Sequence, residues 1–206
     1  MRGYRTLEKG AETELVIQRS RFIGRSFPVE DEGEALSLLG EIRKKNWDAS
    51  HNCFAYRIDT NAARFSDDGE PGGTAGKPIM DVLTGKDLTH ALVVVTRYFG
   101  GILLGAGGLV RAYSRSAADA CAAAGMVEMR PGTRLRMQID YSRYAQLEKL
   151  LSERAQIENT QFAADVLVEA VVDSERAQSL CAAITDKTDG RCLPEIIGEA
   201  YIRLPL

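Results

Sequence analysis

The 206-residue sequence has few cysteines and histidines and no long hydrophobic run. Its four cysteines form no C-x-x-C pair, which argues against a disulfide framework or a cysteine zinc site. His51 is one of two histidines and has no H-x-H or H-x-x-x-H partner, so we expect no resident metal. No apolar run reaches the roughly 18 residues of a transmembrane helix, and residues 1–16 lack the apolar core of a signal peptide. The sequence therefore predicts a cytoplasmic protein that does not enter a membrane.

The chain also lacks a strong charge of either sign. Its net charge of −3 gives no global argument for nucleic-acid binding. Acids and bases balance in residues 1–132, whereas acids are in excess in residues 133–206. Any anion site is therefore expected from local clustering in the first part.

One stretch, residues 93–125, organises the first part of the chain. A valine-rich apolar run predicts a buried strand, a glycine-rich loop follows, and an alanine-rich run over 109–124 predicts a helix closed by Gly125. Such a loop presents backbone N–H groups at a helix N-terminus, where anions bind. No carboxylate lies between Asp87 and Asp119, and Arg111 is expected in the first helical turn. The predicted nucleic-acid or anion site comprises Lys77, Arg97, Tyr98, Gly100, Gly101, Gly107, Gly108, Arg111 and Arg115. The alternative is that the glycines only permit close packing.

Upstream segments supply accessory candidates. Residues 14–29 are expected to be strand, with Arg19, Arg21 and Arg25 on one face if it is unbroken, and residues 31–46 an amphipathic helix. Residues 49–58 predict a strand whose more apolar face, opposite His51, meets the core. Residues 64–79 predict a long loop ending in a short helix. The possible accessory residues are His51, Asp67, Asp68 and Glu70, and the alternative role for these four residues is a site for a hard cation.

The C-terminal part has a regular order of elements. Pro131-Gly132 is a turn dipeptide and predicts a domain boundary, giving domains of 1–132 and 133–206. The second domain alternates as strand, helix, strand, strand, helix and strand, the order of a ferredoxin-like fold. The whole chain is thus expected to be an α+β protein.

Four stretches carry a resemblance to a known family: SRFIG, ASHNCFAYRI, FSDDGEPGGTAGKPI and VVVTRYFGGILLGAGGLVRAY. They resemble the IMPACT family and its bacterial YigZ-type branch, and they span most of residues 15–125. The resemblance implies an N-terminal domain related to the second domain of a small-subunit ribosomal protein. It also implies a C-terminal domain similar to one in elongation factor G. Both likenesses point to translation and RNA.

Three functions remain open at this point. The first is a non-enzymatic RNA- or ribosome-binding protein that regulates translation, with Tyr98 and Phe99 as a stacking face. The second is a hydrolase-like enzyme on a phosphorylated or peptide substrate, with His51 as acid or base. The third is a pure protein-interaction module. No cofactor is expected, because GAGGLV at 105–110 has Val110 where a dinucleotide-binding motif requires its third glycine or alanine.

Overall fold

The computed structural model describes all 206 residues and divides them into two compact units. The first comprises residues 4–128 and 205–206, and the second comprises residues 1–3 and 129–204. No helix combines the length and the apolar character needed to cross a membrane.

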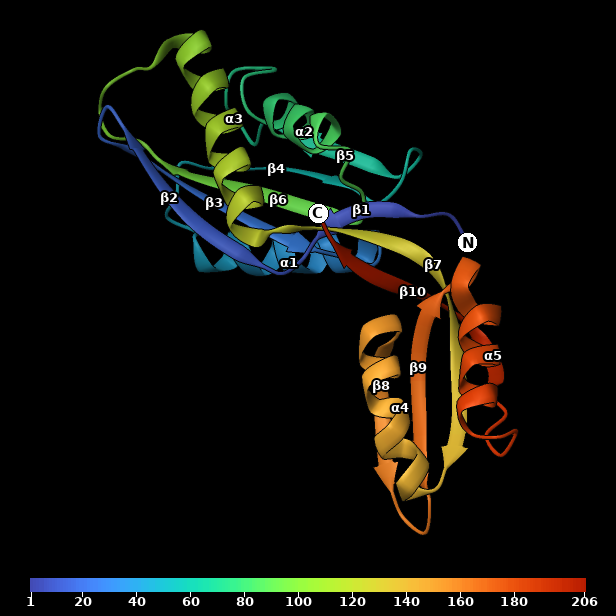
Figure 1. The fold of residues 1–206 in the computed structure, drawn as a ribbon. Helices are drawn as coiled ribbons and strands as arrows, with labels where there is room; N and C mark the ends of the chain where they lie inside the picture. Colours follow the sequence, from blue (N-terminus) through green and yellow to red (C-terminus); the bar gives the residue numbers. More distant parts are fainter. The chain divides into compact units, whose positions relative to one another are not determined.

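The first unit is built on a five-stranded sheet of order β2-β3-β6-β4-β5 in which all neighbours are antiparallel (Figure 1). Its strands are β2 (Ala11–Ile17), β3 (Ser20–Pro28), β4 (His51–Arg57), β5 (Ala63–Ser66) and β6 (Ala91–Tyr98), and a short strand, β1 (Tyr4–Leu7), precedes them. The central strand β6 contains consecutive valines, and β-branched residues favour a strand that is buried on both sides.

Helices cover both faces of this sheet (Figure 1). On one face lies α1 (Glu32–Lys45), which packs on Leu92 and Val94 of β6. On the other lie α2 (Gly76–Gly85) and α3 (Gly105–Ala124), which pack on the alternate residues Val93 and Val95. The expectation that the face of β4 opposite His51 meets the core is confirmed by the burial of Phe54 and Tyr56, and the other face of the strand is covered as well.

Three local differences from the sequence expectations affect the site. The stretch 14–29 is a hairpin of β2 and β3 and not one strand, and Arg19 lies in its turn with a positive φ of 66°. Residues 63–66 form β5, so the loop is shorter than expected. The helix α3 begins at Gly105, which puts Arg111 in the second turn and not the first. The hairpin was missed because its turn has no glycine or proline.

The second unit has the element order β7, α4, β8, β9, α5 and β10, in which β9 pairs with both β7 and β8, and β10 pairs with β7 (Figure 1). Leucines of α4, aliphatic residues of α5 and alternate residues of β7 and β9 form one hydrophobic cluster, so both helices pack on the same face. The elements are β7 (Met126–Ile139), α4 (Tyr141–Arg154), β8 (Gln156–Phe162), β9 (Val166–Asp173), a 3-10 turn (Ser174–Arg176), α5 (Ala177–Lys187) and β10 (Glu195–Pro205).

The expected turn at Pro131-Gly132 is absent, since β7 runs through both residues without a break. The boundary between the two compact units lies between Glu128 and Met129, within β7.

Candidate functional site

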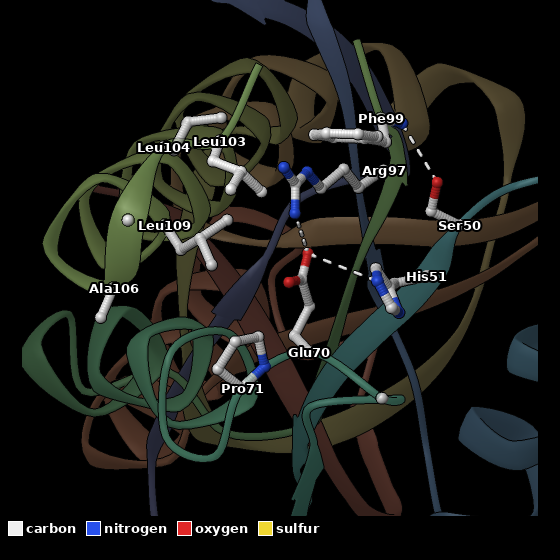
Figure 2. A pocket seen from close by; sticks show the side chains of 12 residues that line it. Ser50, His51, Glu70, Pro71, Arg97, Phe99, Leu103, Leu104, Ala106 and Leu109 are labelled. Carbon is white, nitrogen blue, oxygen red and sulfur yellow. Dashed lines mark hydrogen bonds and ion pairs between the residues drawn. The ribbon is translucent and has the colours of Figure 1, made fainter. Parts of the chain in front are cut away.

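A pocket opens in the first unit where the ends of β4 and β6 meet the loop before α2 and the start of α3 (Figure 2). Its volume is about 450 Å³. Three polar residues from three different segments, His51, Glu70 and Arg97, lie on one side of it. The other lining residues are mainly apolar: Ser50, Gly69, Pro71, Phe99, Leu103, Leu104, Gly105, Ala106 and Leu109.

The register of the sheet brings His51 and Arg97 together, because they are direct partners in the β4–β6 pair. Both side chains then project to the face covered by α2 and α3. Tyr98, the next residue on β6, points to the opposite face, where its hydroxyl contacts Asn46 and Asp48 at 3.3 Å. Tyr98 and Phe99 therefore do not form one stacking surface, and only Phe99 lines the pocket.

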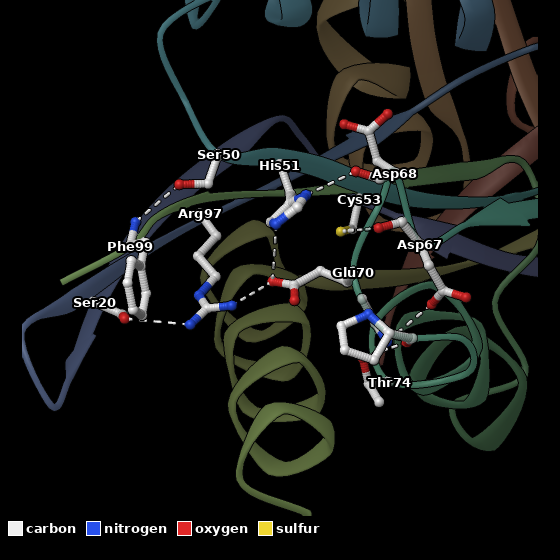
Figure 3. A network of polar contacts seen from close by, with 12 residues as sticks. Ser20, Ser50, His51, Cys53, Asp67, Asp68, Glu70, Thr74, Arg97 and Phe99 are labelled. Atoms are coloured by element: carbon white, nitrogen blue, oxygen red, sulfur yellow. Dashed lines mark hydrogen bonds and ion pairs between the residues drawn. The ribbon is translucent and has the colours of Figure 1, made fainter. Parts of the chain in front are cut away.

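Glu70 is the centre of a buried polar network (Figure 3). Its Oε1 accepts a hydrogen bond from Nη1 of Arg97 at 2.6 Å and another from the hydroxyl of Tyr113 at 2.7 Å. The side chain of Glu70 is 2% exposed and that of Arg97 is 6% exposed, so water screens this ion pair weakly. Burial, together with the neighbouring Cys53 and Glu70, raises the pKa of Tyr113, which keeps its hydroxyl a donor.

His51 is held in one orientation by the loop before α2. Its Nδ1 lies 2.8 Å from the carbonyl oxygen of Asp68, and because a carbonyl can only accept, Nδ1 carries the hydrogen. Nε2 then faces Oε1 of Glu70 at 3.9 Å. In the neutral ring this nitrogen is an acceptor, which suits it to proton transfer or ligand contact.

The neighbouring thiol of Cys53 is not suited to nucleophilic chemistry. It donates to the carbonyl oxygen of Asp67 at 3.0 Å and is fully buried. Burial is the main reason that its pKa is raised to about 12, so the thiolate form is scarce at neutral pH. A His51–Cys53 catalytic pair is therefore not supported by the geometry.

The three acids of the loop have different partners. Asp67 accepts hydrogen bonds from the backbone N–H groups of Gly73, Ala75 and Gly76 at 2.8–3.0 Å, and it orders the entry to α2. Asp68 accepts from Arg43 and from the backbone of Asn52, both at 2.7 Å. Only Glu70 reaches the pocket, and no group of three or more His, Cys, Asp or Glu side chains is placed to hold a metal ion.

Packing requirements account for Gly100. A Cβ on this residue would lie 2.0 Å from the carbonyl carbon of Arg19, so only glycine lets the β2–β3 turn approach. Its N–H donates to Oγ of Ser20 at 3.2 Å and is already used. This residue supports the packing alternative and not an anion contact.

The start of α3 retains features of an anion site. No side chain caps its first turn. Gly107 leaves room for Arg111, whose Nη1 lies 3.6 Å from the position of a Cβ on that glycine. Side chains of a helix lean toward its N-terminus, so Arg111 lies over the first turn although it belongs to the second. It makes no ion pair within the protein.

The remaining predicted cations are paired. Lys77 forms an ion pair with Asp81, and Arg115 lies 3.7 Å from Asp119; both pairs are exposed. Of the residues predicted to bind nucleic acid, the pocket lining includes only Arg97, together with the accessory residues His51 and Glu70. The other predicted residues lie outside the lining: Lys77, Tyr98, Gly100, Gly101, Gly107, Gly108, Arg111, Arg115, Asp67 and Asp68.

Sequence reasoning missed the apolar half of the pocket, formed by Leu103, Leu104 and Leu109 with Pro71. A signal was present: Ile102, Leu103 and Leu104 interrupt the glycine-rich loop, and Leu103 is 83% exposed in the structure. Phe99, Ile102 and Leu103 are all exposed within five residues of the chain, and a group of exposed apolar side chains indicates a contact surface where a single one does not.

Fold and pocket thus define a two-unit α+β protein with a partly apolar pocket, and comparisons identify its family. Residues 18–121 match the Impact N-terminal domain, and residues 137–191 match DUF1949, a domain of unknown function. The chain belongs to the IMPACT family, which confirms the resemblance seen in the sequence.

Relatives match along most of the chain. It is 37% identical over 194 residues to IMPACT family member YvyE of Bacillus subtilis, covering 93% of this chain and 89% of that protein. It is 34% identical over 179 residues to IMPACT family member YigZ of Escherichia coli, covering 84% and 88%. A crystal structure of a hypothetical protein matches with a TM-score of 0.61 and 30% identity, covering 96% of this chain and 98% of that chain.

Proposed function

We propose that this IMPACT family protein is a non-enzymatic, cytoplasmic RNA-binding protein that regulates translation, with the ribosome or its RNA as partner. One observation carries the proposal: an apolar pocket with an exposed aromatic ring, Phe99, adjoins an uncapped helix start with a free arginine, Arg111. The resemblance of the two domains to those of a ribosomal protein and an elongation factor supports the connection to translation.

In this proposal one unpaired base enters the pocket and stacks on Phe99, which is 48% exposed. The adjoining phosphate lies at the first turn of α3, where N–H donors and the helix dipole favour an anion. Arg97 does not supply the phosphate contact, because Glu70 already neutralises it. Lys77 and Arg115 add contacts by exchanging exposed carboxylate partners for phosphate, since exposed pairs are weak.

The test is binding of a labelled single-stranded RNA between 50 and 200 mM salt, followed by fluorescence anisotropy. Phe99→Ala is expected to weaken binding by about 1–3 kcal/mol through lost stacking. Phe65→Ala is the matched control, because Phe65 is 45% exposed and lies on β5 outside the pocket. Equal effects of the two substitutions, or no binding by the wild type at 50 mM salt, would contradict the proposal.

Arg111→Ala is expected to weaken binding to all sequences and to reduce the slope of log K against log salt by about one. Arg203→Ala, an exposed arginine of β10 in the second unit, is the control and should leave the slope unchanged. Circular dichroism spectra of each variant establish that the fold is retained.

A second candidate rests on His51. Its fixed Nδ1 hydrogen and its Nε2 in the pocket suit a general acid or base, and water would then have to be the nucleophile because Cys53 is excluded. Under this hydrolase-like function His51→Ala abolishes release of phosphate or peptide products. Under the binding function, neither the wild type nor the folded His51→Ala variant releases phosphate or peptide products.

A further inference from the structure

The turn between α1 and β4 presents the only tryptophan of the chain to solvent. Trp47 is 83% exposed, whereas tryptophan side chains are highly buried on average. Hydrogen bonds hold this turn in one conformation: the N–H of Ala49 donates to the carbonyl oxygen of Asn46 at 3.1 Å. The hydroxyl of Tyr98 lies 3.3 Å from side-chain oxygens of Asn46 and Asp48, the two neighbours of Trp47. A ring on a fixed backbone loses little conformational entropy on binding, so this arrangement favours a contact role for Trp47.

The segments that carry Trp47 and Phe99 meet at one edge of the five-stranded sheet. Because β6 is antiparallel to β4, the end of β6 lies beside the start of β4. The N–H of Ser50 donates to the carbonyl oxygen of Arg97 at 2.9 Å, and the N–H of Phe99 donates to Oγ of Ser50 at 3.1 Å (Figure 3). The turn that carries Trp47 is therefore joined to the strand end that carries Phe99.

Free cations lie at this edge as well. Lys44 and Lys45, in the last turn of α1, are exposed and form no ion pair within the protein. Arg19 is also exposed and without an ion pair, and its turn lies at the same edge because β3 begins beside the end of β6. The neighbouring acids without an ion pair are Glu41 and Asp48, so the cations are in excess. This excess is complementary to the phosphates of a nucleic acid.

We infer that Trp47 is a second base-stacking position for the same single-stranded RNA, with phosphates of the strand on Lys44 and Lys45. The inference rests on the proposed function, in which Phe99 stacks the first base. The guanidinium of Arg97 lies over the Phe99 ring, 5.4 Å from its centroid, so that ring has one face left for a single base. A further base along the strand needs another aromatic platform, and an exposed indole supplies one.

The residues around Trp47 favour RNA over a protein partner. The cores of protein interfaces are depleted of charged residues, lysine among them. Trp47 instead lies within two positions of Lys45 and Asp48 in the chain. Aromatic rings beside cations are typical of sites for single-stranded nucleic acid, in which the rings stack the bases and the cations follow the backbone.

The experiment uses the full chain and a uridine decamer, and it follows two signals. Fluorescence anisotropy of a labelled decamer measures RNA binding as a whole. The fluorescence of Trp47, titrated with the unlabelled decamer, reports the second position alone because the chain has no other tryptophan. We expect the decamer to quench this fluorescence with the midpoint of the anisotropy change, since a stacked base quenches indole emission.

The two signals separate the inference from the proposed function. A decamer that binds by anisotropy and leaves the tryptophan fluorescence unchanged would overturn the inference and leave the proposed function standing. A decamer that does not bind the wild type at all would refute both.

Substitutions of Trp47 test whether the ring stacks a base. Trp47→Ala should weaken binding of the decamer about tenfold. Trp47→Phe should bind with nearly the affinity of the wild type, because it keeps an aromatic face. Phe65→Ala is the control for the loss of an exposed ring elsewhere in the first unit. Equal affinities of Trp47→Ala and Phe65→Ala would overturn the inference.

The salt dependence of binding tests the two lysines. The double substitution Lys44→Ala and Lys45→Ala should reduce the slope of log K against log salt by about 1.4, the value for two phosphate contacts on a single strand. The double substitution Lys149→Ala and Lys187→Ala removes the same charge from exposed positions of the second unit and should leave the slope unchanged. Equal slopes for the two double variants would contradict the inference.

Discussion

At the scale of single residues, the structure separates three acids that look alike in the sequence. Asp67 orders the loop before α2, Asp68 pairs with Arg43, and Glu70 neutralises Arg97 beside the pocket. The residue types of the site were predictable, since His51, Glu70 and Arg97 were all candidates. Their convergence was not, because it depends on strand register and on a buried contact between residues 27 positions apart.

Glu70→Gln should lower the free energy of unfolding by about 3–5 kcal/mol, because it leaves the buried Arg97 charge without a counter-charge. The measurement is urea denaturation of the full chain, followed by far-ultraviolet circular dichroism. Glu14→Gln is the matched control, since it breaks an exposed pair with Arg21 and should change stability little. Equal losses in the two variants would show that burial of the Glu70 pair has no energetic consequence.

The hydrogen bonds of Asp67 predict that the free energy of unfolding depends on pH. Burial raises the pKa of its carboxyl, but hydrogen bonds from Gly73, Gly76 and Ala75 outweigh this and lower the pKa below its usual value. A lowered folded pKa gives stability that is present above the unfolded pKa of about 4 and is lost as pH falls through the folded value.

Asp67→Asn should therefore cost about 2 kcal/mol at pH 7, and the difference from wild type should shrink below about pH 4. Urea denaturation at pH 7, 5 and 3.5 measures this difference. A difference that stays constant over the series would show that the negative charge of Asp67 does not contribute.

At the scale of elements, the sequence predicts correctly the helices and strands in which apolar residues recur at a regular spacing. The helix expected over 31–46 is confirmed as Glu32–Lys45, capped by Asp31, and the final strand expected in the C-terminal domain is confirmed as Glu195–Pro205. The elements that were predicted wrongly have a common cause: contacts between residues far apart in the sequence decide where these strands and turns lie. Continuation of β7 through Pro131-Gly132 and the turn at Arg19 both run against the local preferences of their residues.

Packing of α3 on β3 makes a testable contrast between two glycines. A Cβ on Gly24 would lie 2.5 Å from the carbonyl oxygen of Ser116 in α3, so Gly24→Ala should cost about 1–3 kcal/mol by forcing the helix off the sheet. Gly40 in α1 is exposed with open space around its Cβ position, so Gly40→Ala should gain up to about 1 kcal/mol. Thermal denaturation compares the variants, and a stabilising Gly24→Ala would refute the packing argument.

At the scale of the whole molecule, the chain has separate hydrophobic clusters and no residue belongs to more than one of them. Ile79 belongs to a cluster of the first unit, and Leu147 belongs to the cluster of the second; both are fully buried. Replacing either by alanine leaves a cavity and is expected to cost about 2–5 kcal/mol in its own unit. Since a domain is stabilised by its own core, we expect each loss to be confined to one unit.

Hydrogen exchange followed by mass spectrometry measures this directly, because slowly exchanging amides report the opening of the unit that contains them. Ile79→Ala should speed exchange in peptides of β4, β6 and α3 and leave those of β7, β9 and α4 unchanged, and Leu147→Ala should do the reverse. Leu36→Ala, at a position 41% exposed on α1, is the control and should affect neither set strongly. Faster exchange in both sets after either core substitution would show that the units unfold together, so that the pocket of the first unit depends on the stability of the second.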